Sequence, residues 1–342
     1  ASNHSPPRNL RLTQPSFDVV AIGNAIVDVI APTDDAFLAL HALPKGGMQL
    51  IDAATADFLY AEMGAARETS GGSAANTLAG LAALGKRCGF IGQVADDQLG
   101  KIFTHDIRAL GVDYRTPAAN GGVPTARCLV MVTPDAQRTM NTFLGASQHL
   151  PASALDPEMI RAGGILYLEG YLWDPEEPRK AMRAAIEMAR AAGRKIAFTL
   201  SDGFVIERHR DDYMELINSG LIDILFSNEA EIQALAEVHD FEKAVAAIAA
   251  KVPVLVSTRS EKGAIAIAEG MRYEVYAAAV EEVIDTTGAG DLFAAGFLAA
   301  YVEGENITQC LKLGAVCAAE IISHYGARPE ADMKALRAHS GL

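Results

Sequence analysis

Residues 285–291 read Asp-Thr-Thr-Gly-Ala-Gly-Asp and lead into the apolar run Leu292-Phe293-Ala294-Ala295-Gly296-Phe297-Leu298, which has the composition of a buried helix. The glycines let the backbone turn tightly, so the amides of Gly288, Ala289 and Gly290 can converge at the start of that helix. Amides at a helix N-terminus, helped by the helix dipole, bind a phosphate or a developing oxyanion. Asp291 falls in the first turn, where its carboxylate can take a proton from a hydroxyl that attacks phosphorus. The structural alternative is a simple helix cap, because Asp is favoured in first turns.

A second glycine-rich turn, Gly71-Gly72-Ser73-Ala74-Ala75-Asn76, precedes an apolar helical pattern that ends near Gly85. Its two glycines permit close approach of the backbone to a ligand, and Asn76 offers both a donor and acceptors. The alternative is a tight strand-to-helix connection in which Asn76 bonds its own turn.

Apolar strand-like runs alternate with helical patterns along most of the chain, which predicts a mostly parallel sheet with helices on both faces. The predicted strands are 17–22, 87–94, 165–168, 195–200, 222–226 and 254–257, and the predicted helices include 176–192, 207–218 and 241–250. Ligands on such sheets bind beyond the carboxyl ends of the strands. We expect Asp28, Asn228 and Thr258 at these ends.

Two segments break this rhythm. Residues 33–51 contain the short strand-like run 48–51, and residues 125–143 read as strands 126–132 and 138–143 joined by a turn. A small sheet assembled from such separate insertions would form a lid that excludes water from a phosphoryl transfer.

The two turns, in this order and roughly two hundred residues apart, resemble the PfkB (ribokinase-like) family of carbohydrate and nucleoside kinases, over Phe17 to about Pro329. Asn228-Glu229-Ala230-Glu231 is similar to the family's Asn-x-x-Glu motif. Residues 254–258 followed by Glu261-Lys262-Gly263-Ala264 resemble the nucleotide-binding strand and turn, although Ser260 stands where many members carry glycine.

The resemblance implies a ribokinase-like three-layer α/β/α fold, with a mostly parallel central sheet and a small β-sheet lid. It implies a flexible tail over 1–16 and a single kinase domain over 17–342, in which the lid is built from about 31–54 and 117–147.

Within the family, Gly23-Asn24-Ala25-Ile26-Val27-Asp28 is similar to the first strand of the adenosine-kinase branch. The resemblance implies that Asp28 accepts hydrogen bonds from the ribose hydroxyls, as a carboxylate can. It adds the following residues to the nucleoside site: Asn24, Gly72, Ser73, Asn76, Met140, Leu144 and Tyr171. Met140, Leu144 and Tyr171 would be apolar walls against a purine, or else ordinary core residues. Arg138 resembles the arginine that lies over the transferring phosphate.

The implied activity is ATP-dependent phosphorylation of the 5′-hydroxyl of a ribonucleoside, with adenosine converted to AMP. Asp291 would be the general base, and Gly288, Ala289, Gly290 and Arg138 would stabilise the developing charge. The implied ATP-binding residues are Asn228, Glu231, Thr258, Gly263, Gly288 and Gly290. Asn228 and Glu231 would reach Mg²⁺ through water. Asp285, Thr287 and Gly326 match parts of the family's K⁺ site, although Glu330 stands where a ribokinase serine would lie.

Three alternatives remain open at this level. A kinase of ribose or fructose would use the same Asp28 and Asn76, and so would a guanosine or inosine kinase. A noncatalytic nucleoside-binding protein on the same scaffold is a hypothesis of another class, but it would have no need of Asp291 or of the converging amides.

Composition disfavours two classes of partner, and the resemblance implies small molecules, a nucleoside and ATP, instead. The chain has 29 basic and 43 acidic residues and a formal net charge of −14, which disfavours nucleic acid and anionic membranes. No apolar run approaches the roughly 20 residues of a membrane helix. Four cysteines without a C-x-x-C pair, and no apolar signal core in the first sixteen residues, predict a cytoplasmic protein. Both a monomer and a lid-mediated dimer are compatible with the resemblance.

Overall fold

The computed structural model describes residues 14–135 and 137–342. The tail predicted for residues 1–16 therefore lies mostly outside the described residues. At its end the Ser16 backbone N–H donates to the Ala162 carbonyl (3.0 Å), so residue 16 is already attached to the folded part.

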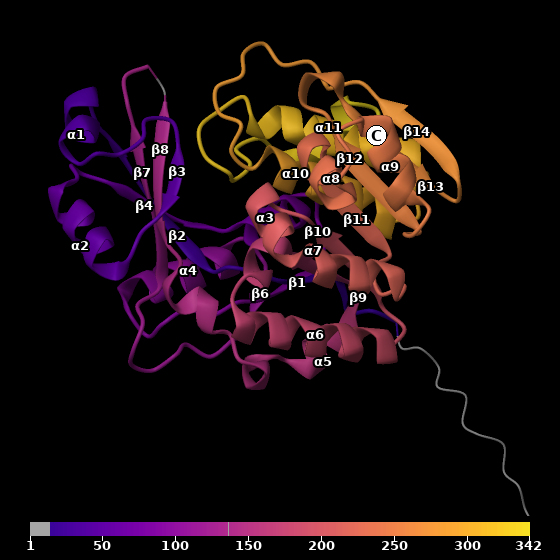
Figure 1. The fold of residues 1–342 in the computed structure, drawn as a ribbon, viewed down its shortest axis with the longest axis horizontal. Helices are drawn as coiled ribbons and strands as arrows, with labels where there is room; N and C mark the ends of the chain where they lie inside the picture. The colour runs from indigo at the N-terminus through magenta and orange to yellow at the C-terminus, as the bar shows by residue number, and fades with distance from the viewer. Residues whose placement is uncertain (1–13, 136) are drawn as a thin grey trace, which may run out of the picture.

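A nine-stranded sheet, called here the large sheet, forms the centre of the molecule (Figure 1). Its strands follow the order β14, β13, β12, β11, β10, β9, β1, β5, β6. In that order they span Met271–Val275, Ala264–Ala268, Val254–Thr258, Ile224–Asn228, Lys195–Thr199, Gly163–Glu169, Phe17–Ile22, Cys88–Ile91 and Asp113–Tyr114. All neighbours are parallel except β13, which is antiparallel to both β12 and β14. The predicted mostly parallel sheet is confirmed.

Helices cover both faces of the large sheet, which gives three layers (Figure 1). One layer comprises α3 (Ser73–Ala83), α4 (Gln98–Ala109), α10 (Ala289–Val302), α11 (Ile307–Ile321) and α12 (Met333–His339). The other comprises α5 (Pro157–Ala162), α6 (Glu176–Ala191), α7 (Gly203–Asn218), α8 (Glu229–Ala236) and α9 (Phe241–Ala249). The short 3-10 turns η1 to η4 span Gly145–His149, Ala152–Ala154, Gly170–Trp173 and Ser260–Lys262.

Alternate residues of each central strand face opposite layers, as the period of two requires. Ile165 and Tyr167 of β9 pack into the core under α3 and α10, whereas Leu166 and Leu168 pack under α6. All four cysteines are buried free thiols.

A five-stranded sheet, called here the small sheet, lies beside the large one, at the left of Figure 1. In the order β3, β8, β7, β2, β4 its strands span Met48–Leu50, Arg138–Phe143, Ala126–Val132, Ile26–Pro32 and Arg67–Gly71. The predicted strands 126–132 and 138–143 have the observed bounds. Strand β4 and most of β2 lie outside the two segments from which a small sheet was expected. Helices α1 (Asp35–Leu40) and α2 (Ala53–Glu62) contribute Leu38 and Leu59 to the core on one face of it.

Asp28 lies inside β2, opposite Thr69 of β4 and Cys128 of β7. The expectation that it ends a strand of the large sheet is therefore wrong. The predicted run 17–22 ends at Ile22, and the chain then leaves the large sheet before Asp28 is reached.

The backbone crosses between the two sheets at two places that touch each other. Residues 23–25 lead from β1 to β2, and Gly72 leads from β4 back into α3. Gly72 has φ of 100°, and a Cβ on it would lie 2.2 Å from the Asn24 carbonyl oxygen. Only glycine permits this approach, so the two crossings form one narrow junction.

Across the described ranges, no helix combines the length and the apolarity that a membrane crossing demands.

Candidate active site

The N-terminus of α10 faces the junction between the two sheets. Gly288 is its N-cap residue, in the left-handed region at φ of 79°, and Asp291 lies in the first turn. A Cβ on Gly290 would meet nothing within 4 Å, whereas one on Gly288 would meet Ala327 Cβ at 2.9 Å. The amide turn is therefore packed on the Gly288 side and open at Gly290, as a site for an anion requires.

The structure brings the two glycine-rich turns together at Asp291. Ser73 Oγ donates to one carboxylate oxygen of Asp291 (2.6 Å), and Asn76 Nδ2 donates to the other (3.0 Å). Burial raises the pKa of Asp291 above its ordinary value, while these two hydrogen bonds and the Arg328 charge oppose the shift. The carboxylate is thus oriented by two side chains, and its pKa moves toward that of a useful base.

Two buried amide oxygens in the same place have no hydrogen-bond partner among the described residues. They belong to the side chains of Asn24 and Asn76, each less than a tenth exposed. Because an unpaired buried acceptor costs free energy, such atoms indicate a place where a ligand donates.

Asp28 contributes a carboxylate to this region from β2 of the small sheet. A Cβ on the neighbouring Gly71 would lie 2.6 Å from its carboxylate, so the glycine leaves room for it. Burial raises the pKa of Asp28 to about 6, and the Arg328 and Arg138 charges limit the rise. Within the described residues, no hydrogen bond satisfies this carboxylate.

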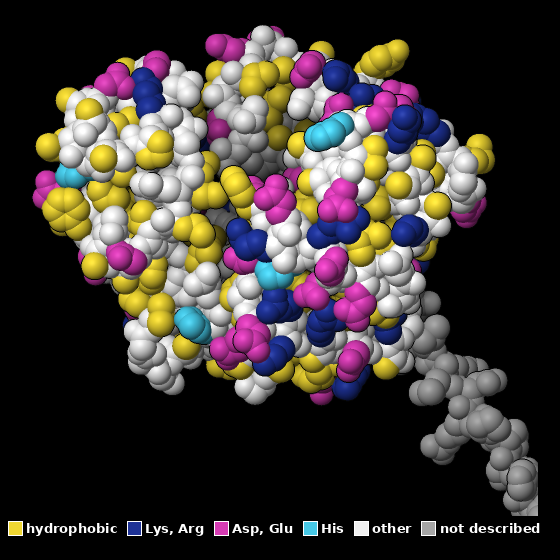
Figure 2. All heavy atoms as spheres, in the orientation of Figure 1, with side chains coloured by type: hydrophobic (Ala, Val, Ile, Leu, Met, Phe, Trp, Pro, Cys, Tyr) yellow, Lys and Arg dark blue, Asp and Glu magenta, His cyan; other side chains and the backbone are white. Residues whose placement is uncertain are grey.

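Register shows which other side chains share the face of Asp28. Cys128 and Thr142 lie directly across from it on β7 and β8, and Thr142 Oγ1 donates to Cys128 Sγ (3.3 Å). Three apolar residues, Val130, Met140 and Met48, lie on this face two positions away from Cys128 and Thr142. The predicted Met140 therefore lies on the same face as Asp28, beside Val130 and Met48, two apolar residues that were not predicted to lie in the site. Figure 2 shows the hollow between the small-sheet lobe and the large lobe.

Residues 16–333 match the model of the pfkB family of carbohydrate kinases. The chain belongs to this family. It is accordingly a kinase, a phosphotransferase with ATP as its co-substrate.

Two solved structures are similar over nearly the whole chain. The adenosine kinase of Sinorhizobium meliloti is 46% identical, with a TM-score of 0.88, over 95% of this chain and 99% of that one. A probable sugar kinase of Rhizobium etli CFN 42 is 44% identical, with a TM-score of 0.89, over 96% and 99%. A ribokinase of Arabidopsis thaliana is 29% identical over 96% of this chain and 86% of its own length. These relatives include both nucleoside and sugar kinases, so they do not fix the substrate.

The PfkB motif Asn-x-x-Glu forms a capping box at the start of α8. Asn228 and Glu231 bond each other through backbone and side chain at 2.8 to 3.0 Å. Burial raises the pKa of Glu231 to about 7, and the Asp202 and Asp291 charges add to the rise. Carboxylates that repel one another are a donor set that suits a hard divalent cation. Both oxygens of Glu231 accept from Asn228, so only a contact through water would leave the capping box intact, and Mg²⁺ at these residues stays a prediction.

Asn228 and Thr258 are paired at the carboxyl ends of β11 and β12, as expected. Gly263 follows the 3-10 turn η4 at φ of 91°, and a Cβ there would lie 2.0 Å from the Val275 carbonyl oxygen. Ser260 adopts φ of 52°. This conformation favours glycine, which explains why a glycine would suit that position.

Asp285, Thr287 and Gly326 also come together. The Asp285 carboxylate accepts from Thr287 N (3.1 Å), Thr287 Oγ1 (2.8 Å) and Gly326 N (3.1 Å). Arg138 makes a buried ion pair with it at 2.9 Å and lies over the Tyr325 ring. With four donors on its two oxygens, this carboxylate has no lone pair left for a cation. The residues therefore do not fit K⁺ in this conformation. Arg138 is paired with Asp285, which is close in sequence to the amide turn at Gly288.

Two charged residues of the site, the buried Glu169 and the partly exposed Arg328, were not anticipated. Glu169 ends β9 and accepts from the backbone N–H groups of Asn24 (2.7 Å), on one crossing, and of Ala74 (2.8 Å), in the first turn of α3 just after the other. Burial raises the pKa of Glu169 to about 7, although the two amides oppose the rise. Arg328 lies beyond α11 and donates to Ser70 and Ala75. One weak indication of each residue was present in the sequence: Glu169 directly follows the apolar run 165–168, and Arg328 follows Gly326 and Ala327.

The remaining predicted residues divide between the site and its surroundings. Tyr171 is partly exposed; burial raises its pKa, and the charges of Asp291, Asp202 and Glu231 add to the rise. Leu144 follows β8 and precedes the η1 turn, half-buried. The sole tryptophan, Trp173, belongs to the core, because it is fully buried against Phe198 and Tyr213.

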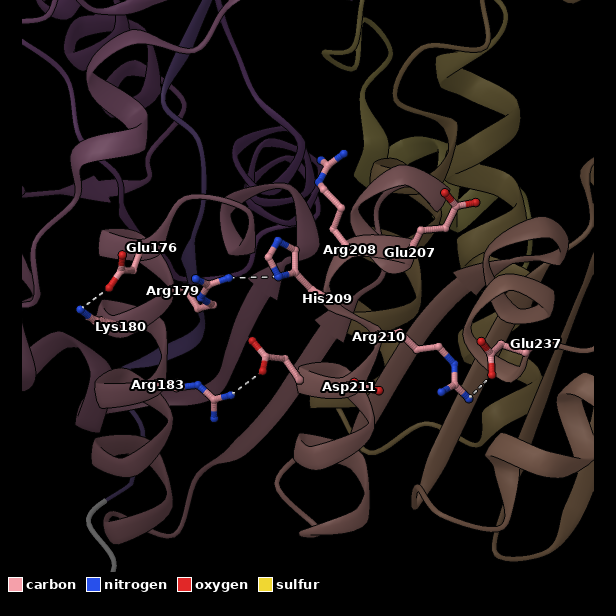
Figure 3. Close-up of a pocket in the computed structure, with 11 residues that line it drawn as sticks. Glu176, Arg179, Lys180, Arg183, Glu207, Arg208, His209, Arg210, Asp211 and Glu237 are labelled. Atoms are coloured by element: carbon pink, nitrogen blue, oxygen red, sulfur yellow. Dashed lines mark hydrogen bonds and ion pairs between the residues drawn. The ribbon is translucent and has the colours of Figure 1, made fainter.

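A separate cavity of about 680 Å³ lies between α6 and α7, away from these residues (Figure 3). Five acidic and five basic side chains line it together with His209. Most of them form ion pairs with one another or with neighbouring acids, as Arg183 does with Asp212 and Arg210 with Glu237. With its charges balanced, this cavity selects no class of ligand.

Proposed function

We propose that this kinase transfers the γ-phosphoryl group of ATP to the 5′-hydroxyl of a ribonucleoside, with adenosine as the acceptor that fits best. The observation that carries the proposal is Asp291, held by Ser73 and Asn76 at the N-terminus of α10 and faced by Asp28 from the small sheet.

In this mechanism the 5′-hydroxyl oxygen attacks the γ-phosphorus, its proton passes to Asp291, and the bond to the ADP oxygen breaks. The amides at Gly288, Ala289 and Gly290 stabilise the charge on the transferring group. Arg138 adds positive charge once it turns from Asp285 toward the phosphate. Mg²⁺, bound near Asn228 and Glu231 through water, would neutralise phosphate charge. The small sheet acts as the lid that excludes water.

The acceptor class follows from what surrounds Asp28. A ribose needs a carboxylate for its vicinal hydroxyls, and the unpaired oxygens of Asn24 and Asn76 add further acceptors. A free sugar has no apolar group that would bury against Val130, Met140 and Met48, which lie on the same face as that carboxylate. A purine ring would bury against it, which supports a nucleoside.

A sugar kinase is the second candidate, favoured by the similarity to the Rhizobium etli probable sugar kinase and to the Arabidopsis thaliana ribokinase. Both candidates share the Asp291 chemistry and differ only in what lies against the small sheet.

The test is ADP release from Mg-ATP with adenosine, guanosine, inosine, cytidine, ribose or fructose as acceptor. We expect turnover with adenosine and AMP as the product. Asp291→Asn should lower kcat by about 10²- to 10⁴-fold while nucleoside binding persists, because only the base is lost. Asp240→Asn, which alters the N-cap acid of α9, is the control and should leave turnover unchanged.

Turnover with ribose or fructose alone would replace the nucleoside with a sugar and keep the base. Binding of adenosine without turnover of any acceptor would mean a noncatalytic nucleoside-binding protein. Full activity of the Asp291→Asn variant would overturn the assignment of the base.

A further inference from the structure

Arg328 connects the segment after α11 to strand β4 and to helix α3. It follows Gly326 and Ala327 in the segment after α11 and is only partly exposed. Its Nε donates to the Ser70 carbonyl (3.2 Å) and its Nη2 to Ser70 Oγ (3.1 Å), both on β4 of the small sheet. Its Nη1 donates to the Ala75 carbonyl in the first turn of α3 (2.7 Å). One guanidinium thus bridges the crossing from β4 to α3.

The bonds made by Arg328 span the residues that hold the acceptor site. Ser70 precedes Gly71 and Gly72, and Ala75 is flanked by Ala74 and Asn76, whose side chain orients Asp291. Asp106 of α4 accepts from the Ser70 backbone N–H (3.1 Å), so Ser70 is fixed on both sides. A fork of three N–H donors suits such a task better than a flexible ammonium does.

Arg328 is also the positive charge shared by the two carboxylates of the site. It lowers the pKa of both Asp28 and Asp291 against the effect of burial. The other charged groups around them are Arg138 beside Asp28, Asp106 beside Arg328, and Glu169 and Glu231, which Asp291 influences. Burial lowers the pKa of Arg328 itself to about 10, so it stays charged near neutrality.

We propose that Arg328 is a positioning residue for the phosphoryl transfer, which fixes the β4–α3 crossing so that Asn76 and Asp291 meet the acceptor, and that its charge acts on both carboxylates of the site. This inference rests on the proposed function only in its choice of acceptor, because it applies to whichever acceptor the wild-type enzyme phosphorylates. A simple structural contact would stabilise the fold and leave the pH profile of the reaction where it was.

Two variants distinguish the effect of the guanidinium hydrogen bonds of Arg328 from the effect of its positive charge. Arg328→Lys keeps the charge and loses the three-point contact, so we expect kcat/KM for the acceptor to fall by about ten- to a hundredfold, with the KM for ATP and the acid limb unchanged. Arg328→Gln loses both, so the acid limb of kcat/KM should move up by about one pH unit, since the two carboxylates lose their cation. Arg108→Gln is the control, because Arg108 also bonds a carbonyl, that of Tyr114, outside the site.

The proposal is overturned if Arg328→Lys has the wild-type kcat/KM for the acceptor, or if Arg328→Gln folds and keeps the wild-type acid limb. Should Arg328→Gln be unfolded at the assay temperature, the Arg328→Lys result decides alone. If wild-type enzyme phosphorylates a sugar rather than a nucleoside, the proposed function fails, and the same variants still test Arg328 with that sugar.

Discussion

We expect the charge state of Asp28 to make the proposed acceptor site sensitive to mild acid. Desolvation of this half-buried carboxylate raises its pKa to about 6, so the protonated form gains as the pH falls through that value. A protonated acid accepts fewer hydrogen bonds from ribose hydroxyls. We therefore expect the KM for the nucleoside to rise below about pH 6, approaching tenfold per pH unit well below the pKa. Initial rates measured with saturating ATP would show this.

The KM for ATP serves as the internal reference, because Asp28 faces the acceptor side. Asp28→Asn should raise the KM for the nucleoside at all pH values and abolish its dependence on pH in this range. An acid limb of nucleoside KM that persists in Asp28→Asn would assign it to another group.

At the scale of single residues, the motifs were predictable and the buried partners were not. Asp291, Ser73 and Asn76 could be grouped because each lies in a glycine-rich turn before an apolar helix. Glu169 and Arg328 could not, because their hydrogen-bond partners lie 95 to 258 residues away along the chain. A charged residue needs protein partners only where it is withdrawn from water, and only the fold shows where that happens and which groups bond it.

At the scale of elements, two glycines at the N-terminus of α10 should respond differently to substitution by alanine. We expect one substitution to impair catalysis and the other to impair stability. Gly290→Ala adds a methyl group that meets no protein atom within 4 Å, so the free energy of unfolding should change by less than about 1 kcal/mol. The methyl enters the space expected to hold the phosphoryl group, so kcat should fall. Gly288→Ala combines φ of 79° with a contact to Ala327 and should lower stability by about 1–3 kcal/mol.

Urea unfolding and steady-state rates on both variants would check this pair. Unimpaired kcat in Gly290→Ala would mean that the phosphoryl group does not approach that amide. An unfolding midpoint of Gly288→Ala equal to that of wild type would show that α10 absorbs the change.

The elements that the sequence predicted share a strong local pattern, and those that it missed are defined by their neighbours. Strands β7 and β8 alternate around a clear turn, and their bounds were predicted correctly. Strand β4 reads Arg-Glu-Thr-Ser-Gly, which is polar and ordinarily a loop; its strand state comes from pairing with β2. The reversal of β13 and β14 at the sheet edge was likewise missed, since a run of apolar residues does not encode strand direction.

At the scale of the whole molecule, Glu169 ties the first crossing to the start of α3, which follows the second, because its oxygens accept the backbone N–H groups of Asn24 and Ala74. Glu169→Gln replaces one acceptor with an NH₂ group that would face an N–H donor. We expect the free energy of unfolding to fall by about 1–3 kcal/mol, the cost of leaving a buried donor unpaired. Urea unfolding at neutral pH would measure it.

Glu215→Gln is the matched control, since it removes an acid from an exposed ion pair with Arg183 and should cost less than about 1 kcal/mol. Equal losses in the two variants would mean that the crossings are held by the close packing of Gly72 against Asn24 and not by Glu169.

The burial of Trp173 has a practical consequence for all such measurements. Its indole is the only one in the protein, shielded from water beside Phe198 and Tyr213 and bonded to Asp212 (3.0 Å). Tryptophan emission therefore comes from one point in the layer of α6 and α7, and its red shift in denaturant reports the opening of that layer alone. A second optical label on the small sheet is needed before the two sheets can be said to unfold in one transition.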